Sequence, residues 1–143
     1  MLSDKTPFHE AKYKEEDGEL CPILEIIIGK NKKKIPVYAD TGCSTGVFIS
    51  SEQVKDIDIG EKINDEPSGC IVADGHIIGG DEYVTTAYIN GEKRIINITV
   101  LDPTKILGFV PPKEMTPLLG RNFLDTFDVL FKGKEKKIVL FKC

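Results

Sequence analysis

Residues 38–46 read Tyr38-Ala39-Asp40-Thr41-Gly42-Cys43-Ser44-Thr45-Gly46, a turn of small residues that carries one carboxylate. Apolar, strand-like segments lead into it at 35–39 and leave it at 47–50. Gly42 permits backbone conformations that other residues avoid, and the hydroxyls of Thr41 and Ser44 can hydrogen-bond locally. Such a loop can hold the Asp40 carboxylate in one fixed orientation. An ordinary turn has the same composition, so these residues alone leave a catalytic and a purely structural interpretation open.

The length and composition fit one globular domain. A chain of 143 residues can bury roughly 70% of its unfolded surface. Its apolar fraction of 41% and charged fraction of 29% are ordinary for a soluble protein. The net charge of −4 gives no reason to expect nucleic-acid binding, and Lys32-Lys33-Lys34 is interpreted as a solvated hairpin tip. No apolar run approaches the ~20 residues that span a bilayer, so no membrane partner is expected.

The first residues and the cysteines indicate a cytoplasmic setting. Residues 1–19 are polar and charged, so we expect a flexible arm and no secretory signal. The four cysteines form no C-x-x-C pair, which argues against a zinc site or a disulfide framework and favours reduced thiols. Neither a metal nor another cofactor is expected. The cysteines are Cys21, Cys43, Cys70 and Cys143.

Short apolar runs separated by turn residues predict an all-β chain. Asp74-Gly75 and Asn90-Gly91 are dipeptides that favour hairpin turns. Strands at this spacing favour a small closed β-barrel. A segment within 118–127 has the spacing of one short helix, and 102–117 is expected to be an irregular loop. The expected strands are 22–28, 35–39, 47–50, 70–73, 76–78, 83–89, 93–101, 129–131 and 138–141.

Three features in order now resemble the retroviral-type (retropepsin-like) aspartic proteases. They are Asp40-Thr41-Gly42 between strands, a glycine-flanked hairpin about thirty residues later, and Leu118-Leu119-Gly120-Arg121-Asn122-Phe123-Leu124 before a final strand pair. The resemblance implies an all-β fold, a small closed β-barrel of the retropepsin-like acid protease type with one short C-terminal helix. It divides the chain into the charged arm, 1–19, and a protease domain, 20–143.

The resemblance also implies an activity, an aspartic endopeptidase with peptide or protein substrates. Such an enzyme uses two carboxylates that share one proton, because like charges ~3 Å apart cannot both ionise. One activates a water while the other polarises the scissile carbonyl. The chain has a single Asp-Thr-Gly, so a working pair needs Asp40 from each subunit of a homodimer.

The same resemblance assigns roles around Asp40. Thr41 would brace the two active-site loops across the dimer axis, and Gly42 would leave room for substrate backbone. A flap would close over an extended peptide, with its tip at Ala73, Asp74, Gly75 and His76. Gly120, Arg121 and Asn122 would open the helix as a structural motif. Terminal strands interleave between subunits in this family, which makes 138–141, and less clearly 20–24, candidates for exchange.

Departures from the family pattern leave alternatives open. Cys43 stands where Ala is common, and Ser44 stands where the viral enzymes often have an Asp that pairs with the arginine of Gly-Arg-Asn. Arg121 therefore needs another partner. A catalytically weak or inactive binding or dimerisation module with this fold is the alternative function. The pattern Asp40-x-Gly42-x-Ser44-Thr45 also resembles a phosphate loop of sugar-kinase and actin-like ATPases, but those folds need a longer chain and a second phosphate loop.

Overall fold

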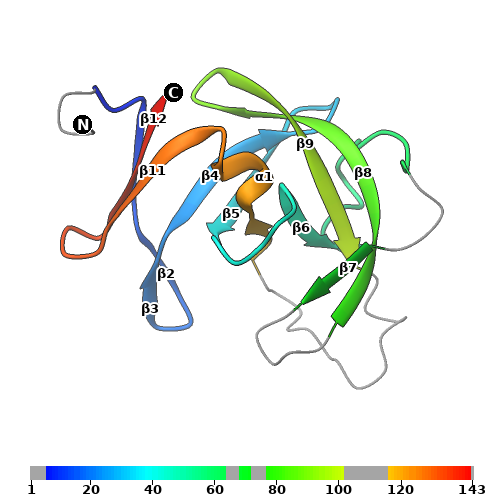
Figure 1. Ribbon diagram of the computed structural model, residues 1–143, viewed down its shortest axis with the longest axis horizontal. Coiled ribbons are helices and arrows are strands. Elements are labelled where there is room, and N and C mark those ends of the chain that lie inside the picture. The colour runs from blue at the N-terminus through cyan, green and yellow to red at the C-terminus, as the bar shows by residue number, and fades with distance from the viewer. Residues whose placement is uncertain (1–5, 64–67, 72–76, 102–115, 143) are drawn as a thin grey trace.

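The computed structural model describes residues 6–63, 68–71, 77–101 and 116–142, and nothing is said of the side chains of 68–71 and 77–79 (Figure 1). Nearly all of the regular structure is strand. The elements are β1 (His9–Lys12), β2 (Lys14–Glu16), β3 (Glu19–Cys21), β4 (Ile23–Ile28), β5 (Lys33–Ala39), β6 (Val47–Ser50), β7 (Ser68–Ile71), β8 (Ile77–Ile89), β9 (Glu92–Leu101), β10 (Leu118–Leu119), α1 (Arg121–Leu124), β11 (Phe127–Lys132) and β12 (Lys137–Lys142).

The main sheet closes on itself. Its strand order is β4-β5-β10-β6-β9-β8-β7, and an additional pairing of β4 with β8 completes the ring. The two residues of β10 lie between β5 and β6: Leu119 pairs parallel with Ala39 and antiparallel with Val47. The all-β class and the closed sheet confirm the sequence prediction. The insertion of β10 brings the two motifs singled out in the sequence to the same place.

Aliphatic side chains fill the interior of this ring. The alternation expected along a strand with one buried face is clear in β9, where Ile96 and Ile98 are buried and Asn97 is not. The helix α1 is short, as predicted, because Leu118 and Leu119 belong to a strand and Phe127 begins another. Its two buried residues, Phe123 and Leu124, still anchor it on the core.

Turn chemistry fixes two hairpins. Asn90 and Gly91 both have positive φ angles (47° and 81°) and join β8 to β9, as the Asn-Gly signal predicts. Asp17 and Gly18 (51° and 81°) do the same between β2 and β3. The second hairpin lies in the segment expected to be a flexible arm.

The first residues also pack on the body of the domain. β1 pairs antiparallel with β12, with His9 opposite Leu140. The ring of Phe8 stacks on Phe127 with centroids 5.8 Å apart, and the Phe8 carbonyl accepts a hydrogen bond from the Asn90 side-chain amide at 2.9 Å. Residues 8–16 therefore differ from the flexible arm expected for 1–19, because apolar side chains among the charges find partners on the core.

Phe8→Ala tests this anchoring. We expect it to lower the free energy of unfolding by about 2 kcal/mol, since a half-buried ring and its stacking partner are lost. Urea denaturation measures the change, with Leu20→Ala as the matched control because Leu20 is 53% exposed on β3. Equal, negligible effects of the two substitutions would mean that the contact of Phe8 with Phe127 contributes no stability.

β12 is the centre of a second, three-stranded sheet with the order β1-β12-β11. Its residues Ile138, Val139 and Leu140 are completely buried within the chain. Both edges of β12 are paired within the chain, and the exchange of residues 138–141 between subunits stays a prediction. Figure 1 shows this sheet at one end of the molecule.

The described residues include no helix of the length and apolarity needed to cross a membrane.

Candidate active site

The loop after β5 holds the Asp40 carboxylate in a defined orientation. The Asp40 amide donates to the Leu119 carbonyl at 2.9 Å, which fixes the backbone against β10. One carboxylate oxygen, Oδ1, accepts the Gly42 N–H at 2.9 Å, and the Asp40 carbonyl accepts the Cys43 N–H at 3.2 Å. Asp40 is half-buried, whereas Thr41 and Gly42 are exposed. A carboxylate that is oriented by its own turn and still reached by solvent is suited to act on a bound molecule.

Tyr38 lies beside this carboxylate, and sequence reasoning did not select it. It is the second-to-last residue of β5, two positions before Asp40, which follows the end of the strand. Burial raises the pKa of the Tyr38 phenol, and the nearby Cys21 thiol, Asp40 and Glu16 raise it further. The neutral phenol is therefore stabilised at the edge of the site. The period-two pattern of β5 was the signal that could have found it.

The Gly120-Arg121 segment is packed directly against the Asp40 loop. The Gly120 N–H donates to the Gly46 carbonyl at 2.9 Å, and the Arg121 N–H donates to the Cys43 carbonyl at 2.7 Å. A Cβ at Gly120 would lie 2.1 Å from the Thr45 carbonyl oxygen, so the approach requires glycine. The two sequence motifs thus form one structural unit, in which the second holds the first.

Asn122 links this unit to β9. Its Oδ1 accepts the Asn97 N–H at 2.9 Å, while the Asn97 carbonyl accepts bonds from the Gly46 N–H at 3.0 Å and from Thr45 Oγ1 at 3.2 Å. The loop is therefore tied to the ring as well as to α1. The family role expected for Asn122 stays a prediction.

Replacing Asn122 separates its hydrogen-bonding role from its packing. We expect Asn122→Ala to cost about 1 kcal/mol, because the Asn97 N–H loses its acceptor, and Asn122→Asp to restore most of that loss. Chemical denaturation measures both, and amide exchange at Asn97 reports the local effect. If the Asp variant is no more stable than the Ala variant, the bond does not hold the loop.

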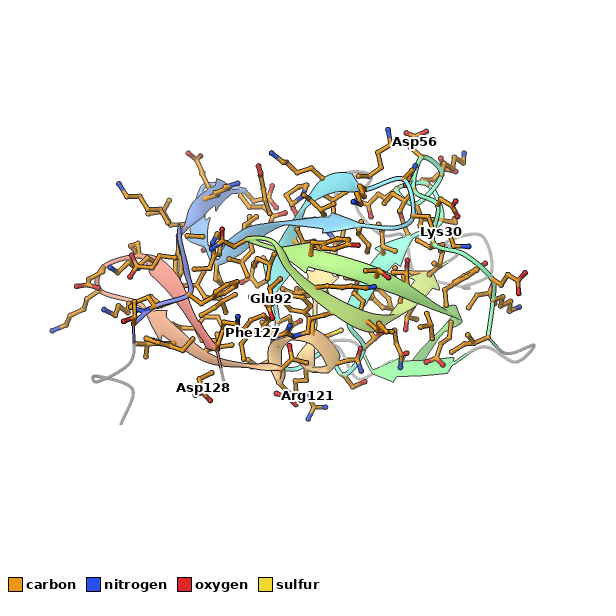
Figure 2. The ribbon with its side chains drawn as sticks, turned by 90° about the horizontal axis from the view of Figure 1, so that it is seen from above. Lys30, Asp56, Glu92, Arg121, Phe127 and Asp128 are labelled. Atoms are coloured by element: carbon orange, nitrogen blue, oxygen red, sulfur yellow. The ribbon has the colours of Figure 1, made fainter. Side chains whose placement is uncertain are left out.

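Thr41 and Arg121 share a groove with α1 and β11. The groove has a volume of about 320 Å³. Figure 2 shows Arg121 and Asp128 on the same side of the molecule, while Phe127 lies further in. The exposed Arg121 thus lines the same groove as Asp125 and Asp128. The lining residues are Thr41, Arg121, Leu124, Asp125, Phe127, Asp128, Val129 and Phe131.

The arms of the expected flap hairpin are present. β7 pairs antiparallel with β8, with Ile71 opposite Ile77. Gly80 at the base of the hairpin packs tightly on β9, since a Cβ there would lie 2.7 Å from Thr99 Cγ2. The expected tip residues, Ala73, Asp74, Gly75 and His76, lie outside the described residues, so their role remains a prediction. Among the residues that the structure describes, no three His, Cys, Asp or Glu side chains gather as metal ligands would.

Comparison with known proteins identifies the fold. No family model matches the sequence, and no curated protein matches it. Among solved structures, EIAV protease in complex with the inhibitor HBY-793 is similar with a TM-score of 0.56 at 19% identity, over 78% of this chain and 92% of that chain. The retroviral protease-like domain of Ddi1 from Leishmania major has a TM-score of 0.49 at 12% identity, over 86% of this chain and 94% of that one. The chain has a retropepsin-like fold.

Proposed function

We propose that this retropepsin-like chain is an aspartic endopeptidase that works as a homodimer, with Asp40 of each subunit in one shared site. The observation that carries the proposal is the orientation of Asp40: the loop after β5 fixes Oδ1 with the Gly42 amide and leaves the side chain half-exposed. The likeness in fold to a retroviral protease supports the same assignment. The requirement for a second subunit follows from there being a single Asp-Thr-Gly in the chain.

The proposed reaction needs only the two carboxyl groups and a water. The ionised carboxylate accepts a proton from the water, whose oxygen attacks the scissile carbonyl carbon. The protonated partner donates to the carbonyl oxygen and so stabilises the tetrahedral intermediate. Transfer of a proton to the leaving nitrogen then accompanies cleavage of the C–N bond, and a carboxylic acid and an amine result. The protons belong to the pair of carboxyl groups rather than to either one.

Thr41 and the groove contribute to the proposed dimer. Thr41 follows Asp40 directly, is exposed, and lines the groove beside β11. An exposed hydroxyl next to the carboxylate is suited to hold the equivalent loop of a second subunit. The two carboxyl groups need such bracing, because a misplacement of about 1 Å can cost roughly 100-fold in rate.

The proposed substrate is an extended peptide. Its backbone would pair with the β7–β8 hairpin on one side and the Asp40 loop on the other, while side pockets set preference. We assign Tyr38 to the wall of one such pocket, since it lies two residues before Asp40 at the end of β5 and is half-buried. Closure of the hairpin would exclude water from the reacting groups.

Cleavage of a peptide library by the wild-type chain from about pH 3 to about pH 7 tests the proposal. We expect internal cuts with a preference around the scissile bond, and activity that alkylation of thiols does not remove. Sedimentation of the same sample should show a dimer. A well-folded dimer that cuts no peptide at any pH would instead indicate a binding or dimerisation module.

A further inference from the structure

Four neighbouring strands of the main sheet carry one row of side chains across the outside of the ring. Lys34 of β5 pairs with Ile27 of β4. Ile27 also pairs with Tyr88 of β8, which pairs in turn with Lys93 of β9. Paired residues of neighbouring strands carry their side chains on the same face of a sheet. The residues on either side of Ile27 are buried in the core, so this row lies on the outer face, with a lysine at each end.

A third lysine reaches the middle of the row. Lys32, in the turn between β4 and β5, holds its ammonium nitrogen 5.4 Å from the centre of the Tyr88 ring. The Asn31 side chain fixes this turn: its amide donates to the Asp56 carbonyl at 2.9 Å, and its Oδ1 accepts the Asp58 N–H at 3.0 Å. An ammonium group that is already held over a ring, on a fixed turn, loses less freedom when it binds an anion.

Two of the three lysines carry uncompensated positive charge. No carboxylate of the residues that the structure describes forms an ion pair with Lys32 or Lys93. Glu92, the neighbour of Lys93 in sequence, is instead paired with Arg94 and Lys142, each at 3.1 Å. The surface therefore attracts negative charge from outside the chain.

The remaining lysine has a weak partner. The Glu25 carboxylate lies 3.8 Å from the Lys34 ammonium and 3.7 Å from that of Lys14, so one negative charge is shared by two positive ones. All three side chains are exposed, and ion pairs of this kind contribute little and are screened by salt. An incoming anion can compete for Lys34.

Apolar side chains lie beside the lysines. Ile95, two residues beyond Lys93 in β9, points to the same face and is 71% exposed. Val84, an even number of residues before Tyr88 in β8, also points to that face and is 41% exposed. A partner that neutralises the lysines can thus also remove apolar surface from water.

We propose that this outer face of the main sheet binds an acidic, partly apolar segment of another protein. We call the surface the lysine face and define it by Lys32, Lys34, Tyr88, Lys93 and Ile95. Charge complementarity sets the acidic character of the partner, and the exposed isoleucine sets its apolar part. The facing edges of β4, β5, β8 and β9 are paired with one another, so the partner binds through its side chains and not as an added strand.

A nucleic acid fits the lysine face less well. The net charge of −4 repels a polyphosphate at long range. Single-stranded nucleic acids bind by stacking bases on aromatic rings, and Lys32 already lies over the ring of Tyr88. Ile95 offers no hydrogen bond to a base or a phosphate.

The lysine face is separate from the proposed active site. Lys34 lies at the start of β5 and Asp40 follows its end, so about 20 Å of extended strand separates them. Figure 2 shows Lys30, in the turn between β4 and β5, well apart from Arg121, which packs on the Asp40 loop. The inference therefore goes beyond peptide cleavage and does not depend on it.

Reversal of two lysine charges is the direct test. The probe is a fluorescein-labelled peptide, Glu-Asp-Glu-Phe-Glu-Asp-Leu-Glu, and fluorescence anisotropy measures its binding to the full chain. Lys32→Glu combined with Lys93→Glu should weaken binding by roughly tenfold, because two attractions become repulsions. Circular dichroism should match that of the wild type, since both side chains are exposed.

Lys12→Glu combined with Lys134→Glu is the matched control. It changes the net charge equally, at exposed lysines of β1 and of the turn between β11 and β12. Binding should stay within about twofold of wild type, because exposed charges farther away than the Debye length of ~8 Å are screened at physiological salt. Equal weakening by the two pairs of substitutions, or a wild-type chain that does not bind the probe, would overturn the proposal.

Ile95→Ser tests the apolar contact, with Leu20→Ser as its control. Leu20 is 53% exposed on β3, outside the lysine face. Ile95→Ser should weaken binding about fivefold, and the loss should persist at high salt because apolar contacts are not screened. Wild-type affinity of Ile95→Ser would remove the apolar part of the assignment. An oligothymidylate of the same charge that binds as tightly as the peptide would refute a protein partner.

The lysine face and the proposed protease fail in different ways. Asp40→Asn should bind the acidic peptide as tightly as the wild type. A chain that cleaves peptides but does not bind this probe would refute the lysine face and leave the protease standing. A chain that binds the probe through Lys32 and Lys93 but cuts no peptide would refute the protease and leave the lysine face standing.

Discussion

Asp40→Asn is expected to reduce peptide cleavage by about 10⁴-fold or more while the fold and the dimer persist. In the proposed mechanism this carboxylate takes the proton from water, and general base catalysis contributes up to about 10⁴-fold. A carboxamide cannot accept that proton. In a homodimer the substitution removes both carboxylates at once.

The substitution is conservative in every other respect. Asn has the same shape as Asp, and its side-chain oxygen can still accept the Gly42 N–H that Oδ1 accepts at 2.9 Å. The backbone bond from Asp40 to Leu119 is not touched. Loss of activity with unchanged thermal stability and unchanged sedimentation would therefore be a chemical effect. Cleavage that survives Asp40→Asn in a highly purified sample would mean that a group other than Asp40 catalyses the reaction.

Gly120→Ala is expected to lower the free energy of unfolding by about 3 kcal/mol or more, and the melting temperature by about 10 °C. The cause is steric. The backbone of Gly120 has a φ of −104° and a ψ of −173°, an extended conformation open to alanine. The added methyl group, however, would lie 2.1 Å from the Thr45 carbonyl oxygen and 2.6 Å from that of Cys43. Because these are backbone atoms, relief requires the Asp40 loop to move.

Gly133→Ala is the matched control. Gly133 lies in the turn between β11 and β12, has no heavy atom within 4 Å of an added Cβ, and is not among the glycines of positive φ. Its substitution should change stability by no more than about 0.5 kcal/mol. Thermal unfolding of the two variants measures the difference. A Gly120→Ala variant as stable as Gly133→Ala would show that the Asp40 loop and α1 do not pack as closely as in the structure.

Local chemistry made part of the fold predictable. Asn90-Gly91 specified a hairpin through residues that accept positive φ, and the alternation of β9 identified its buried face. The closed all-β ring followed from short strands at regular spacing. For the site, the presence of Asp40-Thr41-Gly42 and the Gly120-Arg121-Asn122 motif in one chain carried the resemblance to the family. In the structure, β10 brings the two motifs into contact.

Other features depend on contacts between distant segments, which local patterns do not specify. The insertion of β10 between β5 and β6 is set by pairing across about eighty residues of sequence. The charged residues 1–19 show no regular spacing of apolar residues that would predict a strand. β1 nevertheless pairs with β12, which lies far along the chain. The hairpin at Asp17-Gly18 did have a local signal, the same turn dipeptide chemistry used elsewhere, and the high charge of the segment obscured it.

The central claim, that one site uses Asp40 from two chains, is tested most directly by mixing subunits. Wild-type and Asp40→Asn chains are combined at constant total concentration, allowed to exchange, and assayed for peptide cleavage. If only a dimer with both carboxylates is active, activity falls as the square of the wild-type fraction, to about one quarter at an equal mixture. Activity that falls in direct proportion to the wild-type fraction would show that each chain carries its own site, and would contradict the account.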